Sequence, residues 1–258
     1  MSTPLSPFDD AYAAYYDVLY ADKNYVAEAE AIQTILTKHN VPTTGALLEM
    51  GCGSGIHAVE FLKQGYTVHG IDASAAMVSI AQERTKAFDN ATFEAISIES
   101  YRPTRTFDAV ISLFHVVSYL TTNEQLHQLF NNVAKALKTN GVFVFDCWYG
   151  AGVLTDPPNV RTKHMHNTNY DVQRTAKPEL LPNQNKVIVN FEVTVTNKNT
   201  NETHHITEAH HMRYLFTPEV QLLAQHYGLT LSEQSTFMSS ALPSTSTWYT
   251  MYVLSKIL

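Results

Sequence analysis

Three glycines at alternate positions constrain the fold of this chain more than any other feature. They lie in the run Leu47-Leu-Glu-Met-Gly-Cys-Gly-Ser-Gly55, where apolar residues lead into the turn. A second apolar run begins at Tyr66 and ends at Asp72. A strand, a glycine turn, a helix and a second strand that ends in an acidic residue are typical of a nucleotide-binding βαβ unit. The pattern therefore predicts an α/β fold with a ligand at the turn.

The residues around this unit continue the alternation of strands and helices. Short apolar strands that alternate with helices favour a mostly parallel sheet covered on both faces. Ser74 is a suitable N-cap for one of these helices. The predicted strands span residues 46–50, 67–71, 92–96, 108–113 and 141–146, and the predicted helices span 55–63, 74–87 and 123–138.

The pattern changes after Asp146, where prolines exclude a long helix and a β-rich insertion begins. In the insertion, residues 186–196 and 205–216 have the composition of a strand and its returning partner. A helix from Thr217 and two strands near 229–237 and 247–255 are expected to complete the core sheet. The chain is thus divided into a helical cap (1–40), an α/β core (41–146), the insertion (147–216) and a C-terminal part (217–258).

The composition excludes several classes of partner. The 258 residues carry a formal net charge of −7, so no basic surface is expected to attract nucleic acid or an anionic membrane. No long apolar run or signal peptide is found, and Cys52 and Cys147 are read as reduced thiols. We therefore expect a cytoplasmic protein.

The spacing of the glycines also favours one class of nucleotide. A dinucleotide site has the spacing Gly-x-Gly-x-x-Gly, whereas Gly51, Gly53 and Gly55 alternate here. Glu49 would repel a pyrophosphate but could orient a ligand with a positive amino group, and Asp72 can accept hydrogen bonds from both ribose hydroxyls. These features favour S-adenosylmethionine over NAD. The alternative is that the glycines form only a tight strand–helix turn.

The chain at this point resembles the class I S-adenosylmethionine-dependent methyltransferases. The resemblance rests on Glu49–Gly55, on Gly70–Ser74 with Met77 after it, on Phe107–Phe114 and on residues 134–145. It implies a Rossmann-like, mostly parallel sheet with an antiparallel last strand. Ser97 stands where many members have an acidic residue, and the backbone of Ile98 is expected to replace part of that contact. The resemblance places at the cofactor Tyr16, Tyr20, Glu49, Gly51, Gly53, Gly55, Asp72, Ala73, Met77, Ser97, Ile98 and Leu113.

A narrower resemblance covers nearly the whole chain. Residues Tyr16–Tyr20, Asp22–Tyr25, Ser112–Leu120 and His211–Phe216 are similar to the N,N-dimethyltransferases that act on nucleotide-linked amino sugars. The resemblance implies that the insertion helps to cover the sugar site and that the N-terminal tyrosine segment folds over the cofactor. Ser118 stands where glycine is frequent, and His115 replaces a small residue on the acceptor side.

An amine acceptor needs a free lone pair, and histidine is suited to remove a proton near neutral pH. The candidate catalytic residues are His115, Tyr119 and His211, and the candidate substrate-binding residues are Tyr119 and Arg213. Arg213 shares a strand face with His211 and could pair with a phosphate. The alternatives are that these histidines, among 12 in the chain, only pack, and that Arg213 makes a structural ion pair.

No metal site is predicted, because the adjacent histidines at 204–205 and 210–211 point to opposite faces of a strand. The predicted function is transfer of methyl to a small-molecule acceptor, preferably the amine of a nucleotide-linked amino sugar used for a surface polysaccharide or a glycosylated metabolite. Two alternatives stay open: an O- or N-methyltransferase of another small metabolite, and a non-catalytic S-adenosylmethionine-binding protein. Homodimer formation also stays open.

Overall fold

The structure is a computed structural model that describes residues 23–256. The predictions for Tyr16 and Tyr20, and for the first half of the helical cap, lie outside the described residues. Within 23–256, no helix is long and apolar enough to cross a membrane.

A seven-stranded part of the sheet forms the core. Its order is β3-β2-β1-β4-β5-β11-β10, in which β1 to β5 run parallel while β11 is antiparallel to both of its neighbours. This order confirms the predicted sheet with an antiparallel last strand. The strands are β1 (Ala46–Met50), β2 (Thr67–Asp72), β3 (Ala91–Ala95), β4 (Phe107–Ser112), β5 (Leu137–Tyr149), β10 (Leu229–Thr236) and β11 (Tyr249–Lys256).

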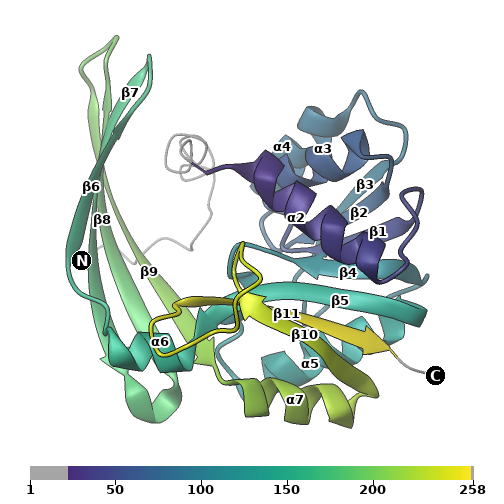
Figure 1. The fold of residues 1–258 in the computed structure, drawn as a ribbon. Helices are drawn as coiled ribbons and strands as arrows, with labels where there is room; N and C mark the ends of the chain where they lie inside the picture. Colours follow the sequence, from purple (N-terminus) through teal and green to yellow (C-terminus); the bar gives the residue numbers. More distant parts are fainter. Residues whose placement is uncertain (1–22, 257–258) are drawn as a thin grey trace.

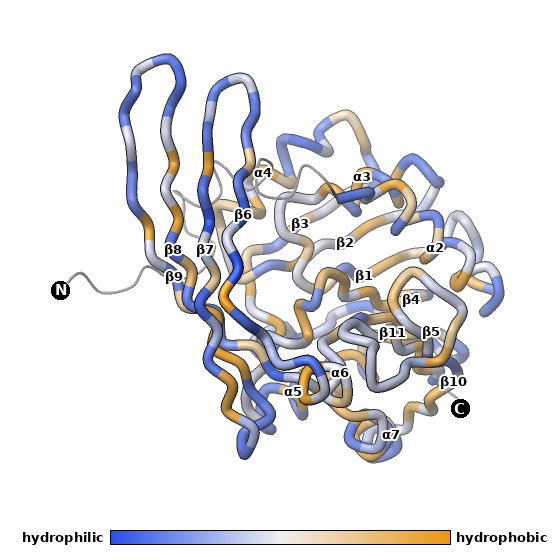
Figure 2. The backbone as a smooth tube through the Cα atoms, turned by 60° about the vertical axis from the view of Figure 1, so that its left-hand side comes forward, coloured by the Kyte–Doolittle hydropathy of each residue, from blue (hydrophilic) through white to orange (hydrophobic). Residues whose placement is uncertain are grey.

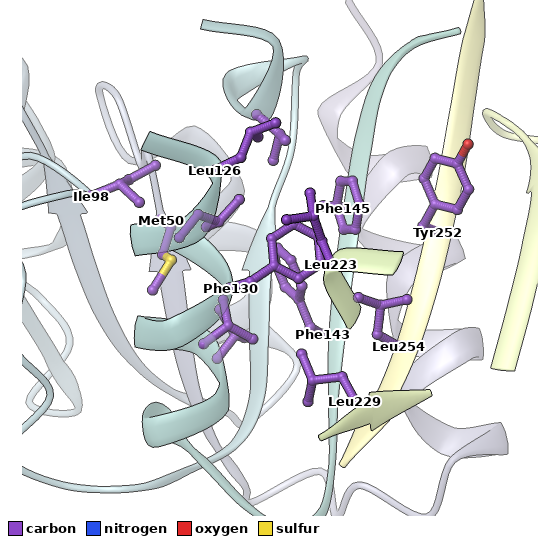
Figure 3. Close-up of a cluster of buried hydrophobic side chains, with 14 of the residues drawn as sticks. Met50, Ile98, Leu126, Phe130, Phe143, Phe145, Leu223, Leu229, Tyr252 and Leu254 are labelled. Carbon is purple, nitrogen blue, oxygen red and sulfur yellow. The ribbon is translucent and has the colours of Figure 1, made fainter. Parts of the chain in front are cut away.

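Helices cover both faces of this sheet (Figure 1). Apolar residues of α2 and α3 pack in one buried cluster, and those of α5 and α7 pack in another. The second cluster contains stacked rings of Phe143 and Phe145, with Phe130 set edge-on (Figure 3). The helices are α2 (Tyr25–Lys38), α3 (Ile56–Lys63), α4 (Ala75–Thr85), α5 (Asn123–Ala136) and α7 (Thr217–His226).

The helix ends follow local chemistry. The Ser74 hydroxyl accepts a hydrogen bond from the Met77 N–H at 3.2 Å, which fixes the start of α4 as predicted. Thr122 and Gln125 form a capping box at the start of α5. That helix ends two residues earlier than predicted, because β5 already begins at Leu137.

The insertion is a curved antiparallel sheet that stands beside the core (Figure 1). Its order is β9-β8-β7-β6, and the tips of the β6–β7 and β8–β9 hairpins are hydrophilic (Figure 2). Strands β6 and β7 lie in a region that we predicted only as lacking a long helix. Its strands are β6 (Arg161–His166), β7 (Tyr170–Leu181), β8 (Lys186–Asn197) and β9 (Thr203–Leu215), with the short helix α6 (Gly150–Thr155) before them.

Strand β5 belongs to both sheets. Trp148 pairs with Tyr249 of β11 in the core and also with Tyr214 of β9 in the insertion. The next residue, Tyr149, pairs with Leu215. The insertion is therefore joined to the core by continuous strand pairing, and its inner face is held beyond the carboxyl ends of the parallel strands.

Candidate functional site

A cavity of about 740 Å³ lies between the core and the insertion. One side is formed by the glycine turn after β1, the residues after β2 and the 3₁₀ helix η1 (Val116–Tyr119) after β4. The other side is the inner face of the insertion sheet. Ligands of parallel α/β sheets bind at this carboxyl end, and the volume is ample for a small-molecule ligand.

The glycines of the turn have different structural roles. All have positive φ, at 76° for Gly51, 51° for Gly53 and 75° for Gly55. A Cβ on Gly51 would lie 2.5 Å from Val116, and one on Gly55 would lie 2.8 Å from Ala81 of α4. A Cβ on Gly53 would meet no atom within 4 Å, and Gly53 lines the cavity. Gly51 and Gly55 thus allow close packing, whereas Gly53 leaves its backbone open to a ligand.

Asp72 links the end of β2 to this turn. One carboxylate oxygen accepts from the Gly53 N–H at 2.9 Å, and the other accepts from the Ser74 N–H at 2.9 Å. Burial raises the pKa of Asp72, while these two hydrogen bonds oppose the rise. Asp72 therefore holds the turn and also presents an acidic group to the cavity.

Most of the predicted cofactor residues that the structure describes meet at this end of the cavity. Glu49 and Gly55 are different, because both lie behind the lining. Glu99 was missed: it lines the cavity two residues after Ser97, and its carboxylate accepts from Gln125 at 2.7 Å. The cavity thus has an acidic side chain, Glu99, two residues after the position where many members of the resembled family have one. The predicted residues that line the cavity are Gly51, Gly53, Asp72, Ala73, Met77, Ser97, Ile98 and Leu113.

A buried group of charges closes the same end. Glu28 of α2 lies 2.8 Å from Lys23 and 2.8 Å from His57 of α3. Burial would raise the pKa of Glu28, but its bonds to His57 and Lys23 bring that pKa below the usual value. Burial lowers the pKa of His57 against the opposing effect of Glu28. Sequence reasoning missed both residues, although His57 directly follows the turn on the buried face of a helix.

Glu49 lies beneath the turn and is 2% exposed. One of its oxygens has no hydrogen-bond partner among residues 23–256, and the other is 4.0 Å from His57. Burial, with the nearby charge of Asp72, raises the pKa of Glu49 to about 8, while Lys23 opposes the rise. The Glu49 carboxyl therefore holds a proton at neutral pH.

Both His115 and Tyr119 line the cavity, as predicted from their place after β4. His115 and the preceding Phe114 have φ of 61° and 65°, which is unusual for residues with large side chains. The His115 ring stacks on Tyr249 at 4.4 Å, and its Nδ1 lies 2.5 Å from a carboxylate oxygen of buried Asp146. Asp146 also accepts from the His115 backbone N–H, and this hydrogen bond stabilises the strained turn at Phe114 and His115.

The structure places His211 and Arg213 outside the cavity lining, contrary to the prediction that both contact the acceptor. Residues Glu208, His210 and Met212 face inward from β9, which leaves His211 exposed and outside the cavity lining. Arg213 forms an ion pair with Glu219 of α7 and does not line the cavity either. The cavity residue is the neighbouring histidine, His210, which contacts Tyr119 through a 2.7 Å hydrogen bond.

We assigned the wrong face of β9 to the cavity, because polar and apolar residues alternate only weakly along this strand. Ile206 and Met212 share the parity of His210 and could have indicated the buried face. Across residues 23–256, no group of three or more His, Cys, Asp and Glu side chains is placed to hold a metal ion.

Comparison with known proteins supports a methyltransferase role for the residues that form the glycine-turn end of this cavity. Residues 47–141 match a family model described as a methyltransferase domain. The chain is 29% identical over 208 residues to a dTDP-3-amino-3,4,6-trideoxy-alpha-D-glucopyranose N,N-dimethyltransferase of Streptomyces venezuelae, covering 79% of the chain and 86% of the relative. It is 25% identical to a dTDP-3-amino-3,6-dideoxy-alpha-D-glucopyranose N,N-dimethyltransferase of Streptomyces fradiae, with coverages of 84% and 82%.

A solved structure supports the fold over the whole chain. A sugar N-methyltransferase from Streptoalloteichus sp. ATCC 53650 superposes with a TM-score of 0.82 and 17% identity, covering 100% of this chain and 97% of that one. The matched domain and this shared fold agree with the sheet order and with the glycine turn that Asp72 holds. Residues 47–141 are therefore a methyltransferase domain, and the chain has the class I fold of the S-adenosylmethionine-dependent methyltransferases.

Proposed function

We propose that this enzyme methylates the amine of a nucleotide-linked amino sugar. The observation that carries the proposal is the distribution of charge in the cavity. Acidic residues lie at the glycine-turn end, where Glu28, Asp72 and Glu99 line the wall. The insertion contributes Lys163 of β6 and Arg174 of β7 to the opposite wall. A cationic cofactor suits the first end, and an acceptor that carries phosphate suits the second.

The placement of these two cations favours an anionic ligand. Lys163 and Arg174 are direct cross-strand partners in the β6–β7 ladder. Like charges directly opposite each other destabilise a strand pair, and a phosphate between them would offset that repulsion. Arg174 also lies over the Phe191 ring at 4.9 Å, which fixes its direction along the cavity wall. The names of the two amino-sugar relatives support the same class of acceptor.

The residues present fit the cofactor that the fold implies. Gly53 offers its backbone without a side chain, and Asp72 presents a carboxylate beside it. S-adenosylmethionine would supply a methyl group that its sulfonium already activates. The protein then needs to align the acceptor, exclude water and handle a proton. We assign the proton handling to Tyr119 and keep His115 as a second candidate for contact with the acceptor.

A screen of acceptors tests the proposal. The enzyme should add methyl mass to dTDP-linked amino sugars in the presence of S-adenosylmethionine, and it should leave the matching hydroxy sugars unchanged. Methylation of the hydroxy sugars or of unrelated metabolites would support the first alternative function instead. Calorimetric binding of S-adenosylmethionine without transfer to any acceptor would support the non-catalytic alternative.

Neutralising the insertion cations should weaken acceptor binding selectively. The double change Lys163→Gln with Arg174→Gln should raise the KM for a nucleotide-linked acceptor at least roughly tenfold, because charge-assisted hydrogen bonds contribute about 1.5–3 kcal/mol. Calorimetry should show unchanged S-adenosylmethionine binding. Lys177→Gln is the matched control, because Lys177 lies on β7 but pairs with Glu192 outside the cavity. An unchanged acceptor KM in the double variant would reject the phosphate assignment.

Removing the Asp72 carboxylate should weaken cofactor binding. Asp72→Ala should reduce S-adenosylmethionine affinity by roughly tenfold or more, because it removes a ligand acceptor and the bond that positions Gly53. Titration calorimetry measures this loss. Asp72→Asn is the control for the turn, since its amide oxygen can still accept from one backbone N–H. If Asp72→Ala binds S-adenosylmethionine like the unmodified protein, the ribose role is rejected.

The remaining predictions depend on composition and resemblance. We infer a cytoplasmic enzyme that serves the synthesis of a surface polysaccharide or a glycosylated metabolite. Homodimer formation stays a prediction, for which sedimentation of the purified protein is the direct measurement.

A further inference from the structure

Three polar side chains form a hydrogen-bonded chain that leads from the cavity into the insertion sheet. The Tyr119 hydroxyl of η1 lies 2.7 Å from Nδ1 of His210 in β9. The other ring nitrogen, Nε2, lies 3.0 Å from a carboxylate oxygen of Glu208, two residues back on the same face of β9. Tyr119 and His210 line the cavity, whereas Glu208 lies behind His210.

One arrangement of protons satisfies both contacts with a neutral imidazole. An ionised carboxylate can only accept, so Nε2 of His210 carries the proton that is donated to Glu208. In a neutral imidazole the other nitrogen is then an acceptor, and it accepts the hydroxyl proton of Tyr119. The hydrogen bonds therefore run from Tyr119 to His210 and from His210 to Glu208, which leaves the tyrosine oxygen ready to accept a proton from a ligand in the cavity.

The hydrogen-bonded side chains Tyr119, His210 and Glu208 are shielded from water except at the cavity. The side chains of His210 and Glu208 are only 4% and 1% exposed. The Phe191 ring of β8 meets His210 edge-on at 5.0 Å, and Arg174 of β7 lies over that same ring. The second oxygen of Glu208 has no hydrogen-bond partner among residues 23–256. Within residues 23–256, the hydrogen bond of the Glu208 carboxylate is thus directed to His210.

Packing alone does not explain this arrangement. Burying ionisable groups costs several kcal/mol of desolvation, and well-packed apolar residues often stabilise a protein as well or better. Two of the three groups also border the cavity, at the carboxyl end of β4 where the acceptor would meet the cofactor. Such a chain is the arrangement that orients a base in acid–base sites.

We propose that His210 and Glu208 complete, with Tyr119, a proton relay that deprotonates the acceptor ammonium. The inference rests on the proposed amine acceptor. His210 is the base that receives the proton through the tyrosine, and Glu208 is a positioning residue that holds the required tautomer. The relay explains why the inward-facing histidine of the pair on β9 is hydrogen-bonded on both ring nitrogens.

The proton balance of the step is as follows. The acceptor ammonium gives a proton to the Tyr119 oxygen while the tyrosine proton passes to Nδ1 of His210, which leaves a neutral amine and an imidazolium beside Glu208. The amine lone pair then forms a bond to the methyl carbon, and the electron pair of the carbon–sulfur bond stays on sulfur. His210 returns its proton through Tyr119 to water after the product leaves.

Kinetics against pH separate this relay from a structural role. Tyr119→Phe and His210→Asn should lower kcat by roughly 10² or more below the pKa of the acceptor amine. The loss should shrink as the pH rises above that pKa, because the amine then arrives without its proton. Glu208→Gln should show a smaller loss with the same pH trend. Binding of S-adenosylhomocysteine should stay unchanged in each variant.

The matched control is His211→Ala, which removes the neighbouring histidine on the outer face of β9 and should leave kcat unchanged. A loss in Tyr119→Phe that is equal at all pH values would overturn the relay and indicate a positioning role only.

A second measurement needs no acceptor and therefore separates failure of the relay from failure of the proposed function. Nitrogen-15 NMR of the imidazole should show His210 with its proton on Nε2, and Glu208→Gln should reduce that preference. A proton on Nδ1 would overturn the relay even if amino sugars are methylated. Failure to methylate any amine would instead reject the proposed function, whatever tautomer is found.

Discussion

Gly51→Ala is expected to lower the free energy of unfolding by roughly 2–5 kcal/mol. The backbone at Gly51 has φ of 76°, where a residue with a Cβ costs about 1–2 kcal/mol. The new Cβ would also lie 2.5 Å from Val116, and overpacking of this kind costs about 1–3 kcal/mol. Denaturant unfolding followed by circular dichroism measures the loss.

Gly53→Ala is the matched comparison for this change. Its φ of 51° imposes similar backbone strain, but its new Cβ would meet no atom within 4 Å. The free energy of unfolding should therefore fall by only about 1–2 kcal/mol. Because Gly53 lines the cavity, S-adenosylmethionine affinity should fall nonetheless. Equal losses of stability in the two variants would show that the contact with Val116 has no energetic weight.

Glu49→Gln should make the stability of the protein less dependent on pH. The pKa of Glu49 rises from 4.5 to about 8 in the folded protein. Between these values the unfolded chain binds fewer protons than the folded one, so the stability of the unmodified protein falls as the pH rises through this window. At about 1.4 kcal/mol per pKa unit, the total loss is a few kcal/mol.

The comparison is made by denaturant unfolding at pH 5 and at pH 8.5. Glutamine resembles the protonated carboxyl in shape, so the variant should match the unmodified protein at pH 5 and exceed it at pH 8.5. Glu94→Gln is the control, because Glu94 is an exposed residue of β3. Parallel pH curves for the Glu49→Gln variant and the unmodified protein would contradict a buried, protonated Glu49.

The cofactor half of the cavity could be predicted from the sequence because its signals are local. The three glycines, the apolar strands and Asp72 each act within one βαβ unit, and the carboxyl ends of its strands must meet at one edge of the sheet. The buried contacts of Glu28 and His57 were beyond reach, because they join helices α2 and α3 that are separated by β1. No local periodicity specifies such a pairing.

The insertion was harder to predict, for reasons visible in its strands. β6 contains a single apolar residue, Met165, so its alternation carries almost no signal. β7 contains Pro178, which argues against a strand, yet β6 begins opposite Ala176 and does not reach Pro178. Pro178 therefore lies on an edge of the sheet, where proline is tolerated. The side chains that face the cavity from this sheet, Lys163 and Arg174, could be assigned only once the register was known.

Because β5 is shared by the core and the insertion, it limits which strands of the insertion can be exchanged between related enzymes. β6, β7 and β8 pair only within the insertion, so they can be grafted as a unit with a new set of cavity side chains. The end of β9 cannot be included in such a graft without care, because Tyr214 and Leu215 are bonded into the core through β5. A chimera that keeps Trp148, Tyr149 and these two partners retains the alignment of the acceptor wall with the cofactor turn.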